Sequence, residues 1–295
     1  MNDIAKKMKN SINILKITGW YNSLSEKNDF DIPYVMFQDS RYSIIYKVYL
    51  ELKKDKFSVE LDSKYAFQMK RTDKLYEIWC YIKICRILKE ELNFEIIDGW
   101  IFEQEINNKK LIVSELKSNT RIAFKNNDII MNLTYDFPIP RSDSETSKFK
   151  DPLYSIRNSN RTDGRLDIYK NKVYIGSIIF EFKYRDRKYL WNYSSKSNNC
   201  ITPQLLDYAS GCKSSYIFSS ECESSNIFSR RLTPVNNVFV LCPESTYNKN
   251  EIHEVEDYCL KFINFKPNKN LELLKDKINN EIKRLEIEYE EFISR

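Results

Sequence analysis

The chain has 295 residues, of which 42% are hydrophobic and 30% are charged. This length and apolar fraction suit one large domain or two smaller ones, and they exclude a disordered chain. Only five glycines are present, and no Gly-rich phosphate-binding motif occurs, so a nucleotide-binding loop of that kind is not expected. The single histidine excludes zinc sites that need several imidazoles. Because His253 lies in an acidic stretch, we expect a solvated surface position for it.

Cysteine usage and hydropathy favour a soluble protein of the reducing cytoplasm. The seven cysteines form no CxxC pair, and no apolar run approaches the ~20 residues of a membrane span. Residues 1–16 mix lysines with apolar residues, which is not typical of a secretory signal. The net charge of +5 is compatible with a nucleic-acid partner but is too small to indicate one.

The first part of the chain has helical patterns followed by strand patterns. Residues 1–68 are expected to form an N-terminal helical region. The apolar residues of 73–92 recur at helical spacing, which predicts a long amphipathic helix there. Strands are expected at 94–103, 111–124 and 129–136, the last two as a hairpin.

A long loop and a second hairpin come next. Residues 137–160 are rich in Ser, Asp, Asn and Pro, have no period and predict a loop. Strands are expected at Arg165–Tyr169 and Val173–Lys183, with the turn at 170–172.

The last part of the chain alternates helix, strand and helix. Thr202-Pro203 predicts a helix start, and Gly211 is well placed to end that helix. A short apolar strand is expected at Val238–Leu241. A long amphipathic helix is expected from Asn268 to the C-terminus. This helix is expected to pack on its own domain, and dimerisation through it stays open.

Acidic residues and a lysine in the second hairpin form the pattern that indicates chemistry. Asp167 lies mid-strand, and Glu181-Phe182-Lys183 follows an apolar run. Alternate side chains of a strand share a face, so Glu181 and Lys183 point the same way, about 7 Å apart. We expect the hairpin to bring Asp167 beside Glu181. Two carboxylates and an ammonium on one face suit a divalent cation that acts on a phosphodiester.

The same [DE]xK spacing occurs elsewhere and is weak evidence alone. It recurs at Glu51, Asp62, Glu115, Asp186 and Glu281. Glu115-Leu116-Lys117 is the main competitor, because an apolar run precedes it as well. It leads into another strand rather than a helix, so the context favours Glu181.

Two helices add polar residues to this pattern. Glu77 on the 73–92 helix flanks a mostly apolar surface, where a carboxylate needs a cation or a hydrogen-bonding partner. The alternative is an exposed helix carboxylate. Gln204 and Tyr208 are four residues apart and share a helix face. With the helix taken in isolation, the pattern favours ordinary surface residues.

The order of these residues resembles the PD-(D/E)XK nuclease superfamily, whose core is α-β-β-β-α-β. The Gln204-x-x-x-Tyr208 element is similar to its RecB-like and McrC-like branches. The segments 39–42, 75–79 and 181–185 look most like McrC-related restriction nucleases. The resemblance covers roughly residues 39–243, and Leu166 stands where the motif has proline.

This resemblance implies an α/β (α+β) restriction-endonuclease-like core at 69–250, with a mixed central sheet flanked by helices. Helical extensions are expected at 1–68 and 251–295. The implied activity is a Mg²⁺- or Mn²⁺-dependent DNA endonuclease of restriction or phage defence. An AAA+ NTPase motor subunit is a possible partner. A catalytically silent DNA-binding or scaffold subunit of an McrBC-like motor complex is the alternative, and an RNA or single-strand nuclease stays open.

The resemblance also implies roles for individual residues. Asp167 and Glu181, with the main-chain carbonyl of Phe182, would bind the metal, and Glu77 would support the metal shell. Lys183 would activate water. Gln204 and Tyr208 would position substrate or water.

The loop at 184–200 interleaves cations with aromatic rings, which suits phosphate contact and base stacking. Its expected DNA-binding residues are Arg185, Arg187, Lys188, Trp191 and Lys196. Surface aromatic side chains that pack on neighbouring helices explain the same pattern equally well.

Overall fold

The computed structural model describes six segments of the chain at the level of side chains. They are residues 71–99, 116–191, 201–219, 232–243, 251–267 and 269–294. The backbone is also described for three short strands at 58–61, 106–107 and 110–113. The chain divides into the units Met1–Lys56 and Phe57–Arg295, and all described residues belong to the second. The helices expected within 1–68 therefore lie outside the described residues, and Ser58–Leu61 is a strand rather than part of a helix.

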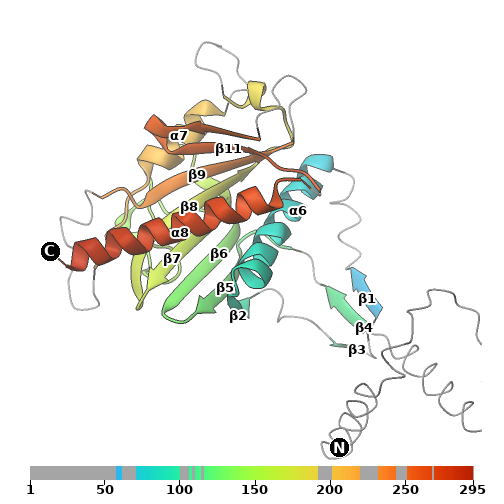
Figure 1. Ribbon diagram of the computed structural model, residues 1–295, viewed down its shortest axis with the longest axis horizontal. Helices are drawn as coiled ribbons and strands as arrows, with labels where there is room; N and C mark the ends of the chain where they lie inside the picture. The colour runs from blue at the N-terminus through green and yellow to red at the C-terminus, as the bar shows by residue number, and fades with distance from the viewer. Residues whose placement is uncertain are drawn as a thin grey trace, which may run out of the picture. The chain divides into compact units, whose positions relative to one another are not determined.

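An eight-stranded mixed sheet forms the centre of the described unit (Figure 1). Its order is β10-β11-β9-β8-β7-β6-β5-β2. The strands are β2 (Glu95–Gly99), β5 (Thr120–Asn126), β6 (Ile129–Pro138), β7 (Arg161–Lys170), β8 (Val173–Phe182), β9 (Val235–Cys242), β10 (Ile252–Val255) and β11 (Leu260–Asn264). Neighbours are antiparallel from β2 to β8, whereas β9 is parallel to both β8 and β11. A separate sheet joins β1 (Ser58–Leu61), β4 (Lys110–Val113) and β3 (Ile106–Asn107).

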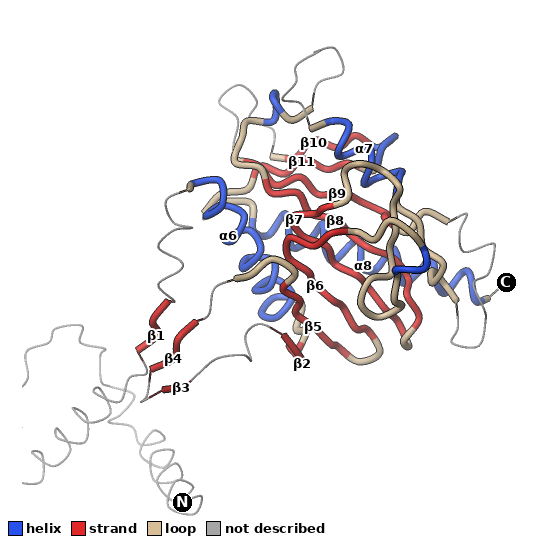
Figure 2. The backbone as a smooth tube through the Cα atoms, turned by 180° about the vertical axis from the view of Figure 1, so that it is seen from behind, coloured by secondary structure: helices blue, strands red, loops and turns tan. Residues whose placement is uncertain are grey.

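Helices cover both faces of the large sheet. They are α6 (Thr72–Arg86), which continues as a π-helix over Ile87–Glu91, α7 (Thr202–Gly211) and α8 (Leu271–Ile293). One core cluster joins α6 and α8 to Leu166 and Phe180 of the sheet. The other joins α7 to Ile179 and Val240 on the opposite face. Figure 2 shows this second face, with α8 behind the sheet.

The burial of the central strands explains their sequences. β7, β8 and β9 are covered on both faces, so they are almost continuously buried and rich in apolar residues. The apolar stripe of α8 (Leu274, Ile278, Ile282, Leu285 and Tyr289) is buried against the sheet. The eight-stranded mixed sheet with three α-helices in the described residues is an α+β fold consistent with a restriction-endonuclease-like core. The predicted fold class is confirmed.

The structure differs from the expected boundary at residue 250. β10 and β11 lie beyond it and belong to the sheet, because β11 pairs with β9 and β10 pairs with β11. Among the described residues of the expected C-terminal extension, only Leu271–Ile293 is α-helical. β10 is a half-buried edge strand, and such a strand carries little of the hydrophobic alternation by which strands are found in a sequence. The first hairpin also differs, because 110–113 pair within the small sheet and β5 begins at Thr120.

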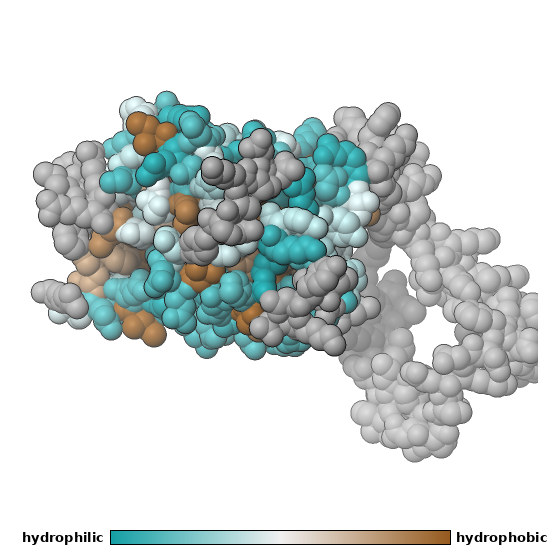
Figure 3. All heavy atoms as spheres, turned by 90° about the horizontal axis from the view of Figure 1, so that it is seen from above, coloured by the Kyte–Doolittle hydropathy of each residue, from teal (hydrophilic) through white to brown (hydrophobic). Residues whose placement is uncertain are grey.

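Hydrophilic residues cover most of the described surface on the face shown in Figure 3, and hydrophobic residues appear there in separate groups. Within the described segments, we find no helix with the length and apolar character needed to cross a membrane.

Candidate functional site

A bulge in the β7–β8 hairpin decides which side chains meet. Tyr169 pairs with Tyr174, but Ile168 pairs with Gly176, so Ile175 is an extra residue in β8. A one-residue shift moves every following side chain of a strand to the other face. Beyond the bulge, each side chain of β8 therefore points to the opposite face of the sheet from the one that regular pairing from the turn would give it.

The register beyond the bulge places Asp163 across from Glu181. Gly164 is paired with Phe180, and the next position of each strand is the acidic one. Asp167 instead faces a position four residues before Glu181, about 13 Å away along the strand. The expected juxtaposition of Asp167 and Glu181 is therefore wrong.

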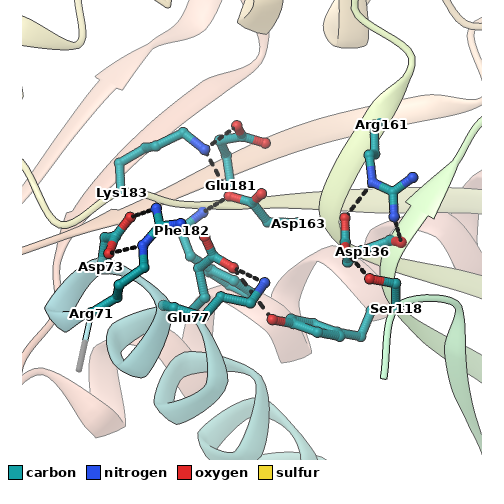
Figure 4. Close-up of polar contacts among 12 residues, drawn as sticks. Arg71, Asp73, Glu77, Ser118, Asp136, Arg161, Asp163, Glu181, Phe182 and Lys183 are labelled. Carbon is teal, nitrogen blue, oxygen red and sulfur yellow. Dashed lines mark hydrogen bonds and ion pairs between the residues drawn. The ribbon is translucent and has the colours of Figure 1, made fainter. Parts of the chain in front are cut away.

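Asp163, Glu181 and Lys183 form a compact charged cluster where β8 ends (Figure 4). The ammonium Nζ of Lys183 lies 2.9 Å from Asp163 Oδ2 and 2.6 Å from Glu181 Oε1. The backbone N–H of Phe182 also donates to Asp163 Oδ2, at 2.8 Å. A lysine thus bridges the two carboxylates, and the backbone of β8 fixes one of them.

Helix α7 holds Glu181 from the second face of the sheet. Gln204 Nε2 lies 2.7 Å from Glu181 Oε1 and 2.9 Å from the hydroxyl of Tyr208. That hydroxyl donates to the backbone carbonyl of Arg161 in β7. Gln204 and Tyr208 share a helix face, as their spacing predicts, and together they fix one oxygen of the Glu181 carboxylate.

The other oxygen of Glu181 has no such support. Glu181 is fully buried, and its Oε2 has no hydrogen-bond partner among the residues that the structure describes. Burial, followed by the negative charge of Asp163, raises the pKa of Glu181 to about 8. Burial alone would lower the pKa of Lys183, but the carboxylates of Glu181 and Asp163 outweigh it and raise that pKa above its ordinary value. Lys183 is therefore a protonated ammonium at neutral pH.

Glu77 reaches the same area from α6. Its Oε2 accepts from Lys74 Nζ at 2.7 Å and from the hydroxyl of Tyr135 at 3.3 Å (Figure 4). Burial raises the pKa of Glu77, and the charge of Asp163 adds to this rise. The expected burial of Glu77 is thus observed in part, and its hydrogen-bonding partners are Lys74 and Tyr135.

Asp167 belongs to a different buried group. It accepts from Arg165 Nε at 3.0 Å and from Ser177 Oγ at 2.6 Å. Arg165 also pairs with Asp151 at 3.2 Å and donates to the carbonyl of Lys150. Burial raises the pKa of Asp167, and Arg165 opposes this rise. The group joins β7 to the 139–160 segment and lies outside the Glu181 cluster.

The residues expected to bind DNA differ in their exposure to solvent. Arg185 and Lys188 are exposed just beyond Lys183, and Arg187 is half-buried. The ring of Trp191 packs against Tyr258 and Phe262, with centroids 6.2 and 5.8 Å away. Trp191 therefore follows the packing alternative rather than stacking from an open surface. Lys196 lies outside the described residues.

The cluster is suited to a divalent cation, although within the described segments no three His, Cys, Asp or Glu side chains form a ready-made cage. Asp163 and Glu181 supply hard carboxylate oxygens, the ligands that Mg²⁺ prefers. A buried carboxylate oxygen without a partner is costly, and Oε2 of Glu181 is such an atom. A cation next to that oxygen would offset this cost.

The sequence predicts most of the cluster, but Asp163 is not among the predicted residues. Glu77, Lys183 and Gln204 lie near Glu181 as expected. The turn at 170–172 contains the signal that points to Asp163. Counting outward from this turn along the two antiparallel strands pairs Glu181 with residue 161, 162 or 163. Asp163 is the acidic residue within that range.

Comparison with known families gives one match. The model of the PD-(D/E)XK nuclease superfamily matches residues 74–204. The matched segment contains Glu77, Asp163, Glu181 and Lys183, and it ends at Gln204. Searches of the curated proteins and of the solved structures gave no match. The similarity indicates metal-dependent nuclease activity, and the fold is consistent with that class.

Proposed function

We propose that this chain is a divalent-metal-dependent nuclease that hydrolyses phosphodiester bonds of DNA, with Asp163 and Glu181 as the metal-binding pair. One observation carries the proposal: two carboxylates and a lysine converge at the end of β8, and a buried oxygen of Glu181 is unpaired within the described segments. The main-chain carbonyl of Phe182 would complete the ligand set, and Glu77 would support it from α6. The proposal keeps the predicted role of Glu181 and transfers that of Asp167 to Asp163.

Mg²⁺ or Mn²⁺ bound there would supply Lewis-acid chemistry, neutralising charge on the phosphoryl oxygens and making bound water more acidic. Lys183 is protonated, so it is suited to donate a hydrogen bond to the attacking water or to a phosphate oxygen, and not to remove a proton. Its contacts with both carboxylates hold this donor within the cluster.

Gln204 and Tyr208 act as positioning residues in this proposal. They fix Glu181 Oε1 through a chain of hydrogen bonds that ends on the β7 backbone. With that oxygen fixed, the orientation of the carboxylate is fixed as well, and Oε2 is left for the metal. Preorganisation of this kind removes the need to reorder the site during the reaction.

The test is cleavage of supercoiled plasmid with Mg²⁺, with Mn²⁺ and with a chelator. We expect Asp163→Asn and Glu181→Gln to lose at least about 100-fold in rate, because each removes charge that binds the metal. The matched control is Asp207→Asn. Asp207 lies on α7 with 23% of its side chain exposed, against 19% for Asp163, and it pairs only loosely with Arg157, at 3.8 Å. Equal cleavage by all variants, or none by the wild type, would contradict the proposal.

We extend the proposal to a role in restriction or phage defence. Its support is the similarity of segments 39–42, 75–79 and 181–185 to McrC-related nucleases. Phage plating on cells that express the wild type should fall relative to cells that express Asp163→Asn, and equal plating would contradict this role. An AAA+ motor partner would be recognised by nucleotide-dependent stimulation of cleavage.

A further inference from the structure

Arg161 lies beside the Asp163 cluster and has no role in the arrangement described above, apart from its backbone carbonyl. It begins β7, two residues before Asp163, which is about 7 Å along the strand. Half of its side chain is exposed, at 50%. An arginine at this position is within reach of any polyanion that enters the cluster.

The guanidinium of Arg161 is held in one orientation (Figure 4). Its Nε donates to Asp136 Oδ1, and its Nη2 donates to the backbone carbonyl of Asp136 at 3.0 Å. Ser118 Oγ donates to Asp136 Oδ2, which fixes the carboxylate in turn. Nη1 has no hydrogen-bond partner among the described residues. The side chain is therefore ordered on one edge and has a free donor on the other.

Asp136 has a backbone conformation that is uncommon for residues other than glycine. Its φ is +47°, in the left-handed region. It lies between the pairs Tyr135–Gly164 and Phe137–Thr162, so its backbone is opposite Asp163. Such conformations cost about 1–3 kcal/mol and are concentrated at functional sites, where the surrounding structure holds them. Here the strained residue is the one that orients Arg161.

The cluster also needs a cation outside the metal position. Asp163, Glu181 and Glu77 place three carboxylates at the point where a phosphodiester must arrive, and Lys183 is already shared between two of them. Arginine presents a planar fork of donors that suits phosphate oxygens, and a preorganised fork loses less entropy on binding.

We infer that Arg161 binds a backbone phosphate of the nucleic-acid strand through Nη1, next to the phosphate that is cleaved, and that Asp136 and Ser118 hold it ready for this contact. The inference rests on the proposed function. It adds a phosphate-binding subsite to the site. The Asp136 carboxylate, which is not one of the proposed metal ligands, orients Arg161 in that subsite.

The test measures binding of a short DNA duplex to the metal-free full chain across a salt series. We expect Arg161→Gln to weaken binding and to reduce the slope of log K against log salt by about 0.9, the loss of one phosphate contact. Arg161→Lys should restore most of the slope, because lysine contacts phosphate as a point charge. Its Mg²⁺-dependent cleavage should still fall about 10-fold, because the oriented fork is lost.

Arg86→Gln is the matched control. Arg86 is 57% exposed and donates to the Glu90 carboxylate through Nε and Nη2. Arg161 uses the same two nitrogens on Asp136, Nε for the carboxylate and Nη2 for the backbone carbonyl. Removal of Arg86 takes away the same charge and should leave the slope within error of the wild type. Thermal unfolding checks that both variants are folded. Equal slopes for folded Arg161→Gln and Arg86→Gln would overturn the inference.

The outcomes separate this inference from the proposed function. If the wild type cleaves DNA and the Arg161 variants behave like the control, only the inference is wrong. If the wild type binds DNA without cleaving it, the proposed function is wrong, and the slope still decides the inference. If the wild type binds no DNA, both are overturned.

Discussion

The substitution Glu181→Gln gives a quantitative test of the cluster without any substrate. The pKa of Glu181 is raised from its ordinary value of 4.5 to about 8, chiefly by burial. A raised carboxyl pKa means that the folded protein loses stability as pH rises from about 4.5 to about 8. At 1.36 kcal/mol for each pKa unit, ionisation of Glu181 costs the metal-free protein up to about 5 kcal/mol above pH 8.

Glutamine keeps the shape of the side chain and removes this cost. Its buried amide introduces an unpaired N–H group, which costs about 1–3 kcal/mol. The net expectation is that Glu181→Gln is more stable than the wild type by about 2–4 kcal/mol at pH 8.5. For a chain of 295 residues that corresponds to roughly 3–6 °C in melting temperature. Below pH 4.5 the advantage should disappear, because Glu181 is then protonated in both states.

The assay is thermal unfolding followed by circular dichroism from pH 4 to pH 9, in the presence of a chelator. The difference in stability between Glu181→Gln and the wild type should rise with pH. Addition of Mg²⁺ at pH 8.5 should stabilise the wild type and leave Glu181→Gln unchanged, because a ligand stabilises only the state that binds it. A difference that is constant with pH would refute the reasoning.

Three further substitutions test other parts of the site. Lys183→Met should slow plasmid cleavage at least about 100-fold. The variant should also be stabilised by lower Mg²⁺ concentrations than the wild type needs, because the ammonium that competes with the metal is gone. Weaker Mg²⁺ binding by the variant would contradict this expectation. Asp167→Asn should lower the unfolding free energy by about 3–5 kcal/mol, because it leaves the buried Arg165 with one carboxylate partner fewer. The folded variant should still cleave DNA. Loss of cleavage well below its melting temperature would return Asp167 to the site. Gly176→Ala should lower the unfolding free energy by about 1–3 kcal/mol in a denaturant titration and should slow cleavage. The reason is that φ is +151° at the bulge and that a Cβ would lie 2.8 Å from Leu285. An unchanged unfolding free energy and cleavage rate would show that the bulge does not need glycine.

The sequence predicts those features of the fold that depend on local patterns. The 73–92 helix and the C-terminal helix follow from apolar stripes, and both are observed as α6 with its π-helical end and as α8. The apolar run before Glu181 predicts a buried strand that ends in charged residues. The spacing of Gln204 and Tyr208 predicts that they share a helix face.

The pairing of Asp163 with Glu181 could not be read from such patterns. It depends on one extra residue, Ile175, and on the close packing of Gly176 against Leu285 of α8, which lies more than 100 residues away in the chain. Without this bulge, residue 181 would face the opposite side of the sheet, so the site depends on a tertiary contact as well as on the motif. The edge strand β10 escaped prediction for a related reason, since it is half-buried and identified mainly by its partner.

Diffraction from a crystal that contains Mn²⁺, measured at the manganese absorption edge, tests the central claim most directly. We expect an anomalous peak within about 2.0–2.6 Å of carboxylate oxygens of both Asp163 and Glu181, in the range of protein ligands to hard divalent cations. The peak should be absent from crystals of Asp163→Asn. A peak at Asp167 and Asp151 instead, or none near Glu181 at saturating Mn²⁺, would contradict the assignment.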